Sequence, residues 1–240
     1  PDAVVQVRSM VEDVPAADLH CAVAPDQPLY PLNPPTGRVV SIVLTGSNAV
    51  LKAYAGISWA SQNLSPFAGG QIPFTQPVSN RAGFKLLEAL TAFEIRLNKG
   101  TRVLDLGAAP GAWTTLLRQR GMRVTAVAPK PLYPWLMVDP DVEYQPTLAE
   151  TYLDRCTATY DLIVNDMILE GQESARLMVG YAEHLRSGGI AIMTLKLHGH
   201  NRQKIMDHAM RLLRKAYKII RVRQLVSNRR EVTLFLRRKE

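Results

Sequence analysis

The sequence has 240 residues, 47% of them hydrophobic, which allows one large α/β domain or one ordinary domain with a smaller companion. Its 29 lysines and arginines against 21 aspartates and glutamates give a net charge of +8, which favours a polyanionic partner such as nucleic acid or a membrane surface. The two cysteines, Cys21 and Cys156, lie far apart and form no CxxC pair, so we expect neither a disulfide framework nor a zinc or other metal site.

The first part of the chain, to about residue 76, is rich in proline and turn-forming residues. Within it, residues 38–44 and 50–57 are apolar and β-branched, and Thr45-Gly46-Ser47-Asn48 lies between them. This pattern predicts a β-hairpin, and the polar stretch at 61–70 predicts a loop. We therefore expect residues 1–75 to form a small N-terminal region that contains a hairpin and a linker.

From residue 77 onward, strand-like and helix-like segments alternate, which predicts a parallel sheet with helices on both faces. The last two strands are joined by a turn too short for a parallel connection, so one of them is antiparallel. We therefore expect residues 76–240 to form an α/β domain whose sheet is mostly parallel, with its last strand antiparallel. The predicted helices are 82–97, 110–120, 175–185 and 202–216, and the predicted strands are 102–106, 123–127, 142–144, 160–164, 190–195, 218–225 and 231–238.

A loop of small residues follows the strand 102–106 and leads directly into a helix. Small residues let the backbone approach a ligand closely, and a helix N-terminus offers N–H groups to it. The loop lacks the dinucleotide pattern GxGxxG but suits the amino-acid end of S-adenosylmethionine, with Asp105 near the ammonium group; the alternative is a tight turn that binds nothing. The expected cofactor-binding residues are Asp105, Gly107, Ala108, Ala109, Pro110, Gly111, Ala112 and Trp113, together with Asp166 after a later strand.

Polar residues occupy corresponding places on separate segments. Asp166 and Lys196 follow apolar strands, and Glu231 begins the antiparallel strand, so all three are expected at the edge where open α/β sheets bind ligands. Lys85 flanks the apolar face of its helix and can reach the same cleft. Each residue also has a simpler interpretation: a solvated Asp or Lys, a lysine that snorkels from the core edge, or a glutamate paired with neighbouring arginines.

This set of residues suits methyl transfer to a ribose 2′-hydroxyl, which is a poor nucleophile at neutral pH. A lysine can accept the hydroxyl proton only if its own pKa is lowered, by desolvation or by a neighbouring cation. Two lysines held between two carboxylates supply the second cation and the hydrogen bonds that orient the base. The transfer itself is an in-line displacement from a sulfonium, for which the protein mainly supplies positioning.

These motifs together resemble the FtsJ-like ribosomal RNA ribose 2′-O-methyltransferases. The resemblance implies a Rossmann-like methyltransferase fold, S-adenosyl-L-methionine as cofactor and RNA, in particular ribosomal RNA, as partner. It also implies a catalytic Lys-Asp-Lys-Glu tetrad made of Lys85, Asp166, Lys196 and Glu231, with Lys196 as the central base. The motifs are Ser79-Asn80-Arg81-Ala82-Gly83-Phe84-Lys85-Leu86, LDLGAAPGAWT at 104–114, Val164-Asn165-Asp166-Met167, Leu195-Lys196-Leu197 and Glu231-Val232-Thr233.

Within the family the chain resembles the RlmM type, which modifies a cytidine of large-subunit ribosomal RNA. Residues 54–58, 63–67 and 228–233 carry this closer similarity. The N-terminal part of that type includes an RNA-binding THUMP domain. Because residues 1–75 are too few for such a domain with its linker, this region would be a reduced RNA-binding version.

Three positions depart from the family pattern. Ala128 occupies the place of the acid that meets the adenosine ribose, and Pro146-Thr147-Leu148-Ala149 replaces the stretch with the adenine-contacting Asp, leaving Glu150 as the nearest acid. Each missing charged hydrogen bond would weaken cofactor binding by about 1–3 kcal/mol. Ala112 replaces a glycine. The main rival hypothesis is therefore an RNA-binding paralogue without turnover; a methyltransferase of small molecules is disfavoured by the basic charge and the paired lysines.

Basic residues are concentrated near the end of the chain, and such residues at the mouth of a cleft fit an RNA substrate, although a solvated basic face is the alternative. No apolar run reaches the length of a membrane span, and Pro1-Asp2-Ala3 does not resemble the start of a signal peptide. We therefore expect a cytoplasmic protein with no membrane partner. The basic and polar residues concerned are His198, His200, Asn201, Arg202, Lys204, Arg221, Arg223, Arg229, Arg230, Arg237, Arg238 and Lys239.

Overall fold

The computed structural model describes residues 38–47, 50–59, 81–198, 201–225, 227–228 and 230–240. The chain divides into two compact units, Pro1–Thr75 and Gln76–Glu240. Across the described ranges, no helix combines the length and the apolar character needed to cross a bilayer.

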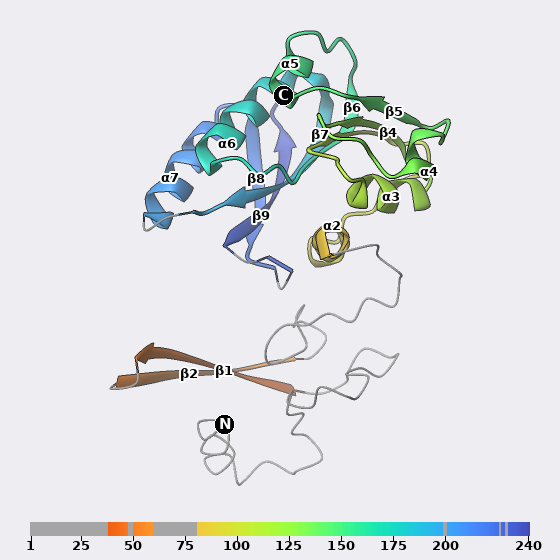
Figure 1. The fold of residues 1–240 in the computed structure, drawn as a ribbon. Helices are drawn as coiled ribbons and strands as arrows, with labels where there is room; N and C mark the ends of the chain where they lie inside the picture. The colour runs from red at the N-terminus through yellow and green to blue at the C-terminus, as the bar shows by residue number, and fades with distance from the viewer. Residues whose placement is uncertain (1–37, 48–49, 60–80, 199–200, 226, 229) are drawn as a thin grey trace. The chain divides into compact units, whose positions relative to one another are not determined.

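The described part of the first unit is a β-hairpin. Strands β1 (Arg38–Ser47) and β2 (Val50–Trp59) pair antiparallel (Figure 1), as predicted. The strands are longer than predicted, because Thr45, Gly46 and Ser47 continue the ladder where a turn was expected. Asn48 and the predicted loop at 61–70 lie outside the described residues.

The second unit contains a seven-stranded sheet in the order β5-β4-β3-β6-β7-β9-β8. Strand β9 is antiparallel to both of its neighbours and the other neighbours pair parallel, which confirms the predicted sheet. The strand order reverses direction between β3 and β6, and open α/β sheets bind ligands at such a point, beyond the carboxyl ends of the strands. The strands are β3 (Arg102–Leu106), β4 (Arg123–Val127), β5 (Val142–Gln145), β6 (Tyr160–Asn165), β7 (Leu185–Lys196), β8 (Tyr217–Arg223) and β9 (Glu231–Arg238).

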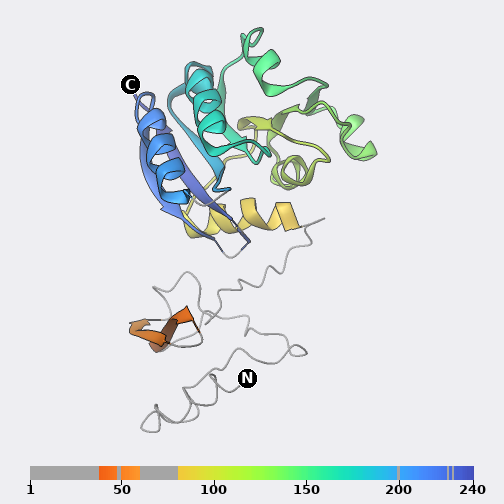
Figure 2. The same cartoon turned by 60° about the vertical axis from the view of Figure 1, so that its left-hand side comes forward.

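Helices cover both faces of this sheet. Helices α6 and α7 lie side by side (Figures 1 and 2) and bury one face in a core that includes Leu234 and Leu236 of β9. On the other face, Phe93 at the end of α2 stacks on Phe235 of β9, with ring centroids 5.9 Å apart. The helices are α2 (Arg81–Ala92), α3 (Ala112–Gln119), α4 (Pro134–Met137), α5 (Ala149–Leu153), α6 (Gly171–Gly180), the 3-10 turn η3 (Tyr181–His184) and α7 (Arg202–Leu213).

Several predicted boundaries were wrong, among them the helix expected at 175–185, which is α6 at Gly171–Gly180 followed by η3. The helix expected at 82–97 ends at Ala92. The apolar pattern suggested a longer helix because Phe93, in the turn that follows, also packs on the sheet. The strand expected at 190–195 begins at Leu185, so that Gly188, with φ +70°, and Gly189 lie inside β7. The strand tolerates them because Tyr160 pairs with Leu185 and Leu162 with Ile190, so an irregularity absorbs the extra residues. The short helices α4 and α5 were not predicted.

Candidate active site

Four polar residues from separate elements meet at the carboxyl edge of the sheet. Asp166 directly follows β6, Lys196 ends β7, and Glu231 begins β9 directly opposite Lys196 in the antiparallel ladder. Lys85 reaches the same place from α2. Parallel strands end at one edge and an antiparallel strand begins there, so the topology places these side chains together.

The four side chains form a closed ring of alternating charge. The Lys85 Nζ lies 3.1 Å from the Asp166 Oδ1 and 2.7 Å from the Glu231 Oε1. The Lys196 Nζ lies 2.6 Å from the Asp166 Oδ1 and also donates to the Glu231 Oε2. Only 8–15% of each side chain is exposed. The formal charges sum to zero, so each charge in this buried cluster has opposite partners.

Two further polar residues, which the sequence analysis missed, hold the ring in position. The Thr194 hydroxyl accepts a hydrogen bond from the Lys196 Nζ at 2.9 Å and donates one to the Asp166 Oδ1 at 2.5 Å. The Asn228 amide donates to the Glu231 Oε1 at 3.4 Å, while its Oδ1 accepts from the Thr233 hydroxyl at 3.0 Å. The strand period was the available signal, because Thr194 precedes Lys196 by two residues and therefore shares its face.

The carboxylates determine the protonation of Lys196. Burial disfavours the ammonium form, but Asp166 and Glu231 outweigh burial and raise the pKa of Lys196 above its ordinary value. Burial likewise opposes the charge on Glu231, but its hydrogen bonds from Lys196 and Lys85 lower its pKa overall. In the free protein Lys196 therefore does not have the lowered pKa that a general base requires, because the two carboxylates contribute more than desolvation.

The loop after β3 is shaped by two glycines with positive φ. Gly107 has φ +78°, and a Cβ there would lie 2.5 Å from the Met167 Cγ; Gly111 has φ +116°, and a Cβ there would lie 2.3 Å from the Leu136 Cδ1. The N–H groups of Gly107 and Ala108 both donate to the carbonyl of Val127, at 3.0 and 3.2 Å. Both positions thus favour glycine by their backbone conformation, and Gly107 also by its close packing on the backbone of Met167, while the start of the loop is tied to the neighbouring strand β4.

Asp105 carries a buried charge that the protein compensates only in part. Its side chain accepts a 2.7 Å hydrogen bond from the Thr114 hydroxyl, and only 1% of the residue is exposed. Among the described residues no lysine or arginine forms an ion pair with it. Burial therefore raises the pKa of Asp105 to about 7, against the hydrogen bond from Thr114 and with a contribution from the nearby Asp166. A carboxylate in this situation complements a cationic ligand group such as an ammonium.

The other end of the expected cofactor site is apolar. Ala128 is buried, and its N–H donates to the Gln145 carbonyl at 3.1 Å. Tyr133 and Trp135 stack with ring centroids 4.5 Å apart, and the Tyr133 N–H donates to the Pro110 carbonyl at 2.8 Å. Leu148, at the start of α5, is 56% exposed. Apolar and aromatic side chains therefore lie on the loops where the family pattern has acids.

Trp113 contributes to packing. Its indole N–H donates to the Ala82 carbonyl at 2.6 Å, and only 3% of the residue is exposed. The contact ties the first turn of α3 to the first turn of α2, the helix that carries Lys85. Trp113 thus links the loop after β3 to the helix that carries Lys85.

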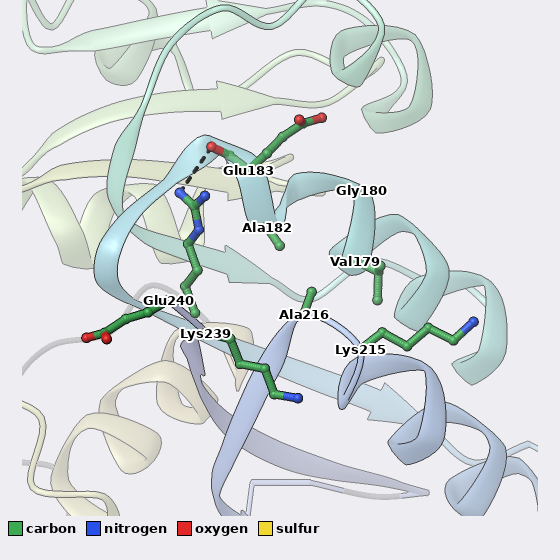
Figure 3. A pocket seen from close by; sticks show the side chains of 9 residues that line it. Val179, Gly180, Ala182, Glu183, Lys215, Ala216, Lys239 and Glu240 are labelled. Atoms are coloured by element: carbon green, nitrogen blue, oxygen red, sulfur yellow. Dashed lines mark hydrogen bonds between the residues drawn. The ribbon is translucent and has the colours of Figure 1, made fainter.

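A separate hollow lies at the opposite edge of the sheet, beside the end of β9 (Figure 3). There the Arg238 guanidinium donates to the carbonyl of Glu183 at 3.3 Å and so holds the η3 turn. Arg238 is seven residues along β9 from Glu231, which corresponds to about 23 Å. The hollow is thus distinct from the tetrad. It is lined by Val179, Gly180, Ala182, Glu183, Lys215, Ala216, Arg238, Lys239 and Glu240.

Comparisons with known proteins agree with this arrangement. Residues 78–222 match the family model of the FtsJ-like methyltransferases. The chain is 36% identical over 162 residues to the ribosomal RNA large subunit methyltransferase M of Halorhodospira halophila, covering 66% of this chain and 47% of that protein. It is 34% identical over 206 residues to the protein of the same name from Marinobacter nauticus, covering 78% of this chain and 55% of that protein. This chain therefore spans about half the length of these relatives.

Among solved structures, fibrillarin in a complex with Nop5p superposes with a TM-score of 0.57 at 18% identity, covering 67% of this chain and 84% of that one. At that identity the likeness concerns the fold alone. Together with the sheet order, it confirms the predicted Rossmann-like methyltransferase fold.

Proposed function

Because the chain belongs to the FtsJ-like methyltransferase family, we propose that it transfers a methyl group from S-adenosylmethionine to a ribose 2′-hydroxyl of RNA. The observation that carries this proposal is the buried ring of Lys85, Asp166, Lys196 and Glu231 beside the buried carboxylate of Asp105. The names of the relatives, ribosomal RNA large subunit methyltransferases, support ribosomal RNA as the substrate class.

Lys196 is proposed as the base that accepts the 2′-hydroxyl proton. At rest it is an ammonium that donates to Asp166, Glu231 and Thr194, so it must lose a proton before it can accept one. In the assembled complex, two effects would disfavour the ammonium form of Lys196 and so lower its pKa. The RNA would exclude water from the ring, and the sulfonium of the cofactor would add a positive charge beside it. After proton transfer, the same three acceptors hold the ammonium, and Lys85 balances the second negative charge of the ring.

The cofactor site is proposed to comprise Asp105, the backbone of residues 107–112 and the first turn of α3. S-adenosylmethionine, when bound, supplies an electrophilic methyl group on a sulfonium. Asp105 would bind the ammonium of its amino-acid end, which would give the buried carboxylate the cation that it lacks. Tyr133 and Leu148 would offer apolar contact to the adenosine end in place of carboxylates. Residues 1–75 remain, as a hypothesis, a reduced RNA-binding region.

The test is transfer of a radiolabelled methyl group from S-adenosylmethionine to large-subunit ribosomal RNA that lacks the modification. We expect the wild type to yield a methylated nucleotide whose 3′ linkage resists alkali, since a 2′-O-methyl group blocks that cleavage. Lys196→Met should reduce the rate by about 10²–10⁴-fold, the usual range for loss of a general base. Calorimetric titration should show its cofactor affinity unchanged within about twofold. Lys215→Met, at an exposed lysine beyond α7, is the matched control and should keep full activity.

A second candidate function rests on Ala128, which leaves the ribose end of the cofactor site without its usual acid. If the folded protein binds RNA but shows no calorimetric binding of S-adenosylmethionine, the chain is an RNA-binding paralogue and the enzymatic proposal is wrong. If the cofactor binds and methyl transfer yields an alkali-labile product, a base is modified and the assignment to ribose is wrong.

A further inference from the structure

The two faces of the last strand pair differ in character. On β9, Val232, Leu234 and Leu236 point toward α6 and α7 and belong to the buried core there. Glu231 and Phe235 alternate with them and point to the face that carries α2 and the tetrad. By the two-residue period of a strand, Thr233 and Arg237 share this tetrad face.

A bulge in β8 sets the direction of its arginines. Ile219 pairs with Leu236 and Arg221 pairs with Phe235, so Ile220 is an extra residue in the ladder. Without it, Arg221 would oppose Leu234 and point toward the helices. The bulge instead turns Arg221 and Arg223 onto the tetrad face, while Ile219 and Val222 pack on the helix-side core.

The result is a row of exposed cations on the tetrad face of the sheet edge, since β8 is the outermost strand. We name this row the basic stripe; it consists of Lys218, Arg221, Arg223 and Arg237. Lys218 lies directly opposite Arg237, a like-charge pair that destabilises a sheet unless an anion compensates it. None of the four forms an ion pair within the described part of the chain. The one carboxylate on β8 and β9, Glu231, is already bound by both lysines of the tetrad.

The basic stripe leads to the tetrad. Arg223 pairs with Thr233, which lies two residues from Glu231 on the same face. From Arg223 to Lys218 the stripe extends about 15 Å along one strand. A narrow stripe on the last two strands, with three of its four cations in a row on β8, suits a single chain of phosphates, and arginine guanidinium groups bind phosphate in a bidentate manner.

We propose that the basic stripe binds the phosphate backbone of a single RNA strand and leads it into the tetrad. This inference rests on the proposed function, because it takes the tetrad as the place where the RNA reacts. The structure thereby separates the arginines of the final strands into two groups. Arg221 and Arg223 face the RNA, whereas Arg238 on the opposite face donates to the carbonyls of Glu183 and Leu185 and is structural.

The experiment measures fluorescence anisotropy of a labelled single-stranded RNA of about 20 nucleotides and mixed sequence, bound to the full chain at several salt concentrations. Arg221→Gln with Arg223→Gln should weaken binding about tenfold at 0.1 M salt and reduce the salt slope by about 1–2, as expected for lost phosphate contacts. The double replacement by lysine should keep most of the affinity. The matched control, Arg211→Gln with Lys215→Gln, removes the same charge from exposed residues at the end of α7 and should change affinity less than twofold.

Several outcomes would contradict the proposal that the basic stripe binds RNA. Equal weakening by both glutamine pairs would mean that net charge alone attracts the RNA. Unchanged binding of the Arg221/Arg223 pair would refute the stripe while leaving the proposed function intact, since cofactor titration and methyl transfer are measured separately. Equally tight, stripe-dependent binding to polyglutamate or to phosphatidylserine vesicles would assign the surface to an acidic protein or a membrane. A wild type that binds no RNA would refute both proposals.

Discussion

The tetrad and the cofactor loop lie at the same edge of the sheet, but their buried charges are compensated differently. In the tetrad, each lysine contacts both carboxylates. Thr194 donates a further hydrogen bond to Asp166, and Asn228 donates one to Glu231. In the loop, Asp105 has one side-chain hydrogen bond, from Thr114, and burial raises its pKa to about 7. In the tetrad every charge has opposite partners before any ligand binds, whereas Asp105 has no ion-pair partner within the part of the chain that the structure describes.

This difference predicts opposite effects of removing a carboxylate charge on stability. Loss of a charge from the tetrad leaves an unmatched buried ammonium and destabilises the fold. Loss of the charge on Asp105 removes a desolvation cost and stabilises the free protein. Functional sites often carry such a cost in stability, and a bound cationic group would supply the interaction that Asp105 is missing.

The largest expected effect is that of Glu231→Gln. The change leaves two buried lysines against Asp166 alone, so we expect the free energy of unfolding to fall by about 3–5 kcal/mol at pH 7. Because the folded-state pKa of Glu231 is lowered, its contribution is present above its unfolded pKa of 4.5 and is lost as the pH falls through the folded value. The difference between wild type and variant should therefore shrink below pH 4.5.

Urea unfolding at pH 7 and at pH 4 measures this effect. Glu173→Gln removes an exposed carboxylate in the first turn of α6 and should change stability by less than about 0.5 kcal/mol. A loss at Glu231 no larger than that of Glu173 would show that the tetrad is not a stabilising network.

The next largest expected effect is that of Asp105→Asn, which should raise the free energy of unfolding instead of lowering it. Asp105→Asn keeps an acceptor for the Thr114 hydroxyl but removes the buried charge. The folded pKa of about 7 lies above the ordinary value of 3.8, so the native state holds the extra proton between these values and wild-type stability falls as the pH rises through this range. The cost is absent below about pH 4 and complete above about pH 7. We expect the variant to be more stable than wild type by about 2–3 kcal/mol at pH 8, and by much less at pH 5.

Thermal unfolding at pH 5 and at pH 8 tests the expected gain in stability. Calorimetric titration of S-adenosylmethionine tests the expected loss of cofactor affinity. Cofactor affinity should fall about 10- to 100-fold in the Asp105 variant, as expected for a lost charged hydrogen bond. Asp207→Asn, at an exposed position on α7, should change neither quantity. A variant that is less stable than wild type at pH 8 would mean that Asp105 is already compensated in the free protein.

Topology alone determines the positions of three members of the tetrad, whereas Lys85, on α2, was placed by the apolar period of its helix and by the family resemblance. Asp166 and Lys196 end parallel strands and Glu231 starts the antiparallel one, so knowledge of the strand order brings them together. The protonation of Lys196 could not be predicted, because it depends on distances of 2.6–3.1 Å and on relative burial, which residue spacing cannot give.

The supporting residues were missed for a related reason. Thr194 and Asn228 resemble ordinary strand and turn residues, and their role depends on which neighbours their hydroxyl and amide groups meet. The bulge at Ile220 was equally invisible, since a one-residue insertion in a strand leaves no mark on its apolar pattern. Yet that bulge decides which arginines face the tetrad.

The smallest expected effect, that of Thr194→Val, tests how the balanced tetrad releases a proton. The Thr194 hydroxyl is one of three acceptors around the Lys196 ammonium, beside Asp166 and Glu231, and Lys85 is the neighbouring cation. Removing one acceptor destabilises the ammonium more than the free amine, so the pKa of Lys196 should fall. If Lys196 is the base, the acid limb of the methyl-transfer rate should move to lower pH by about one unit, the equivalent of one hydrogen bond to a charged group. A merely structural role for Thr194 would lower the rate at every pH without moving the limb, and Thr194→Ser should restore the wild-type profile.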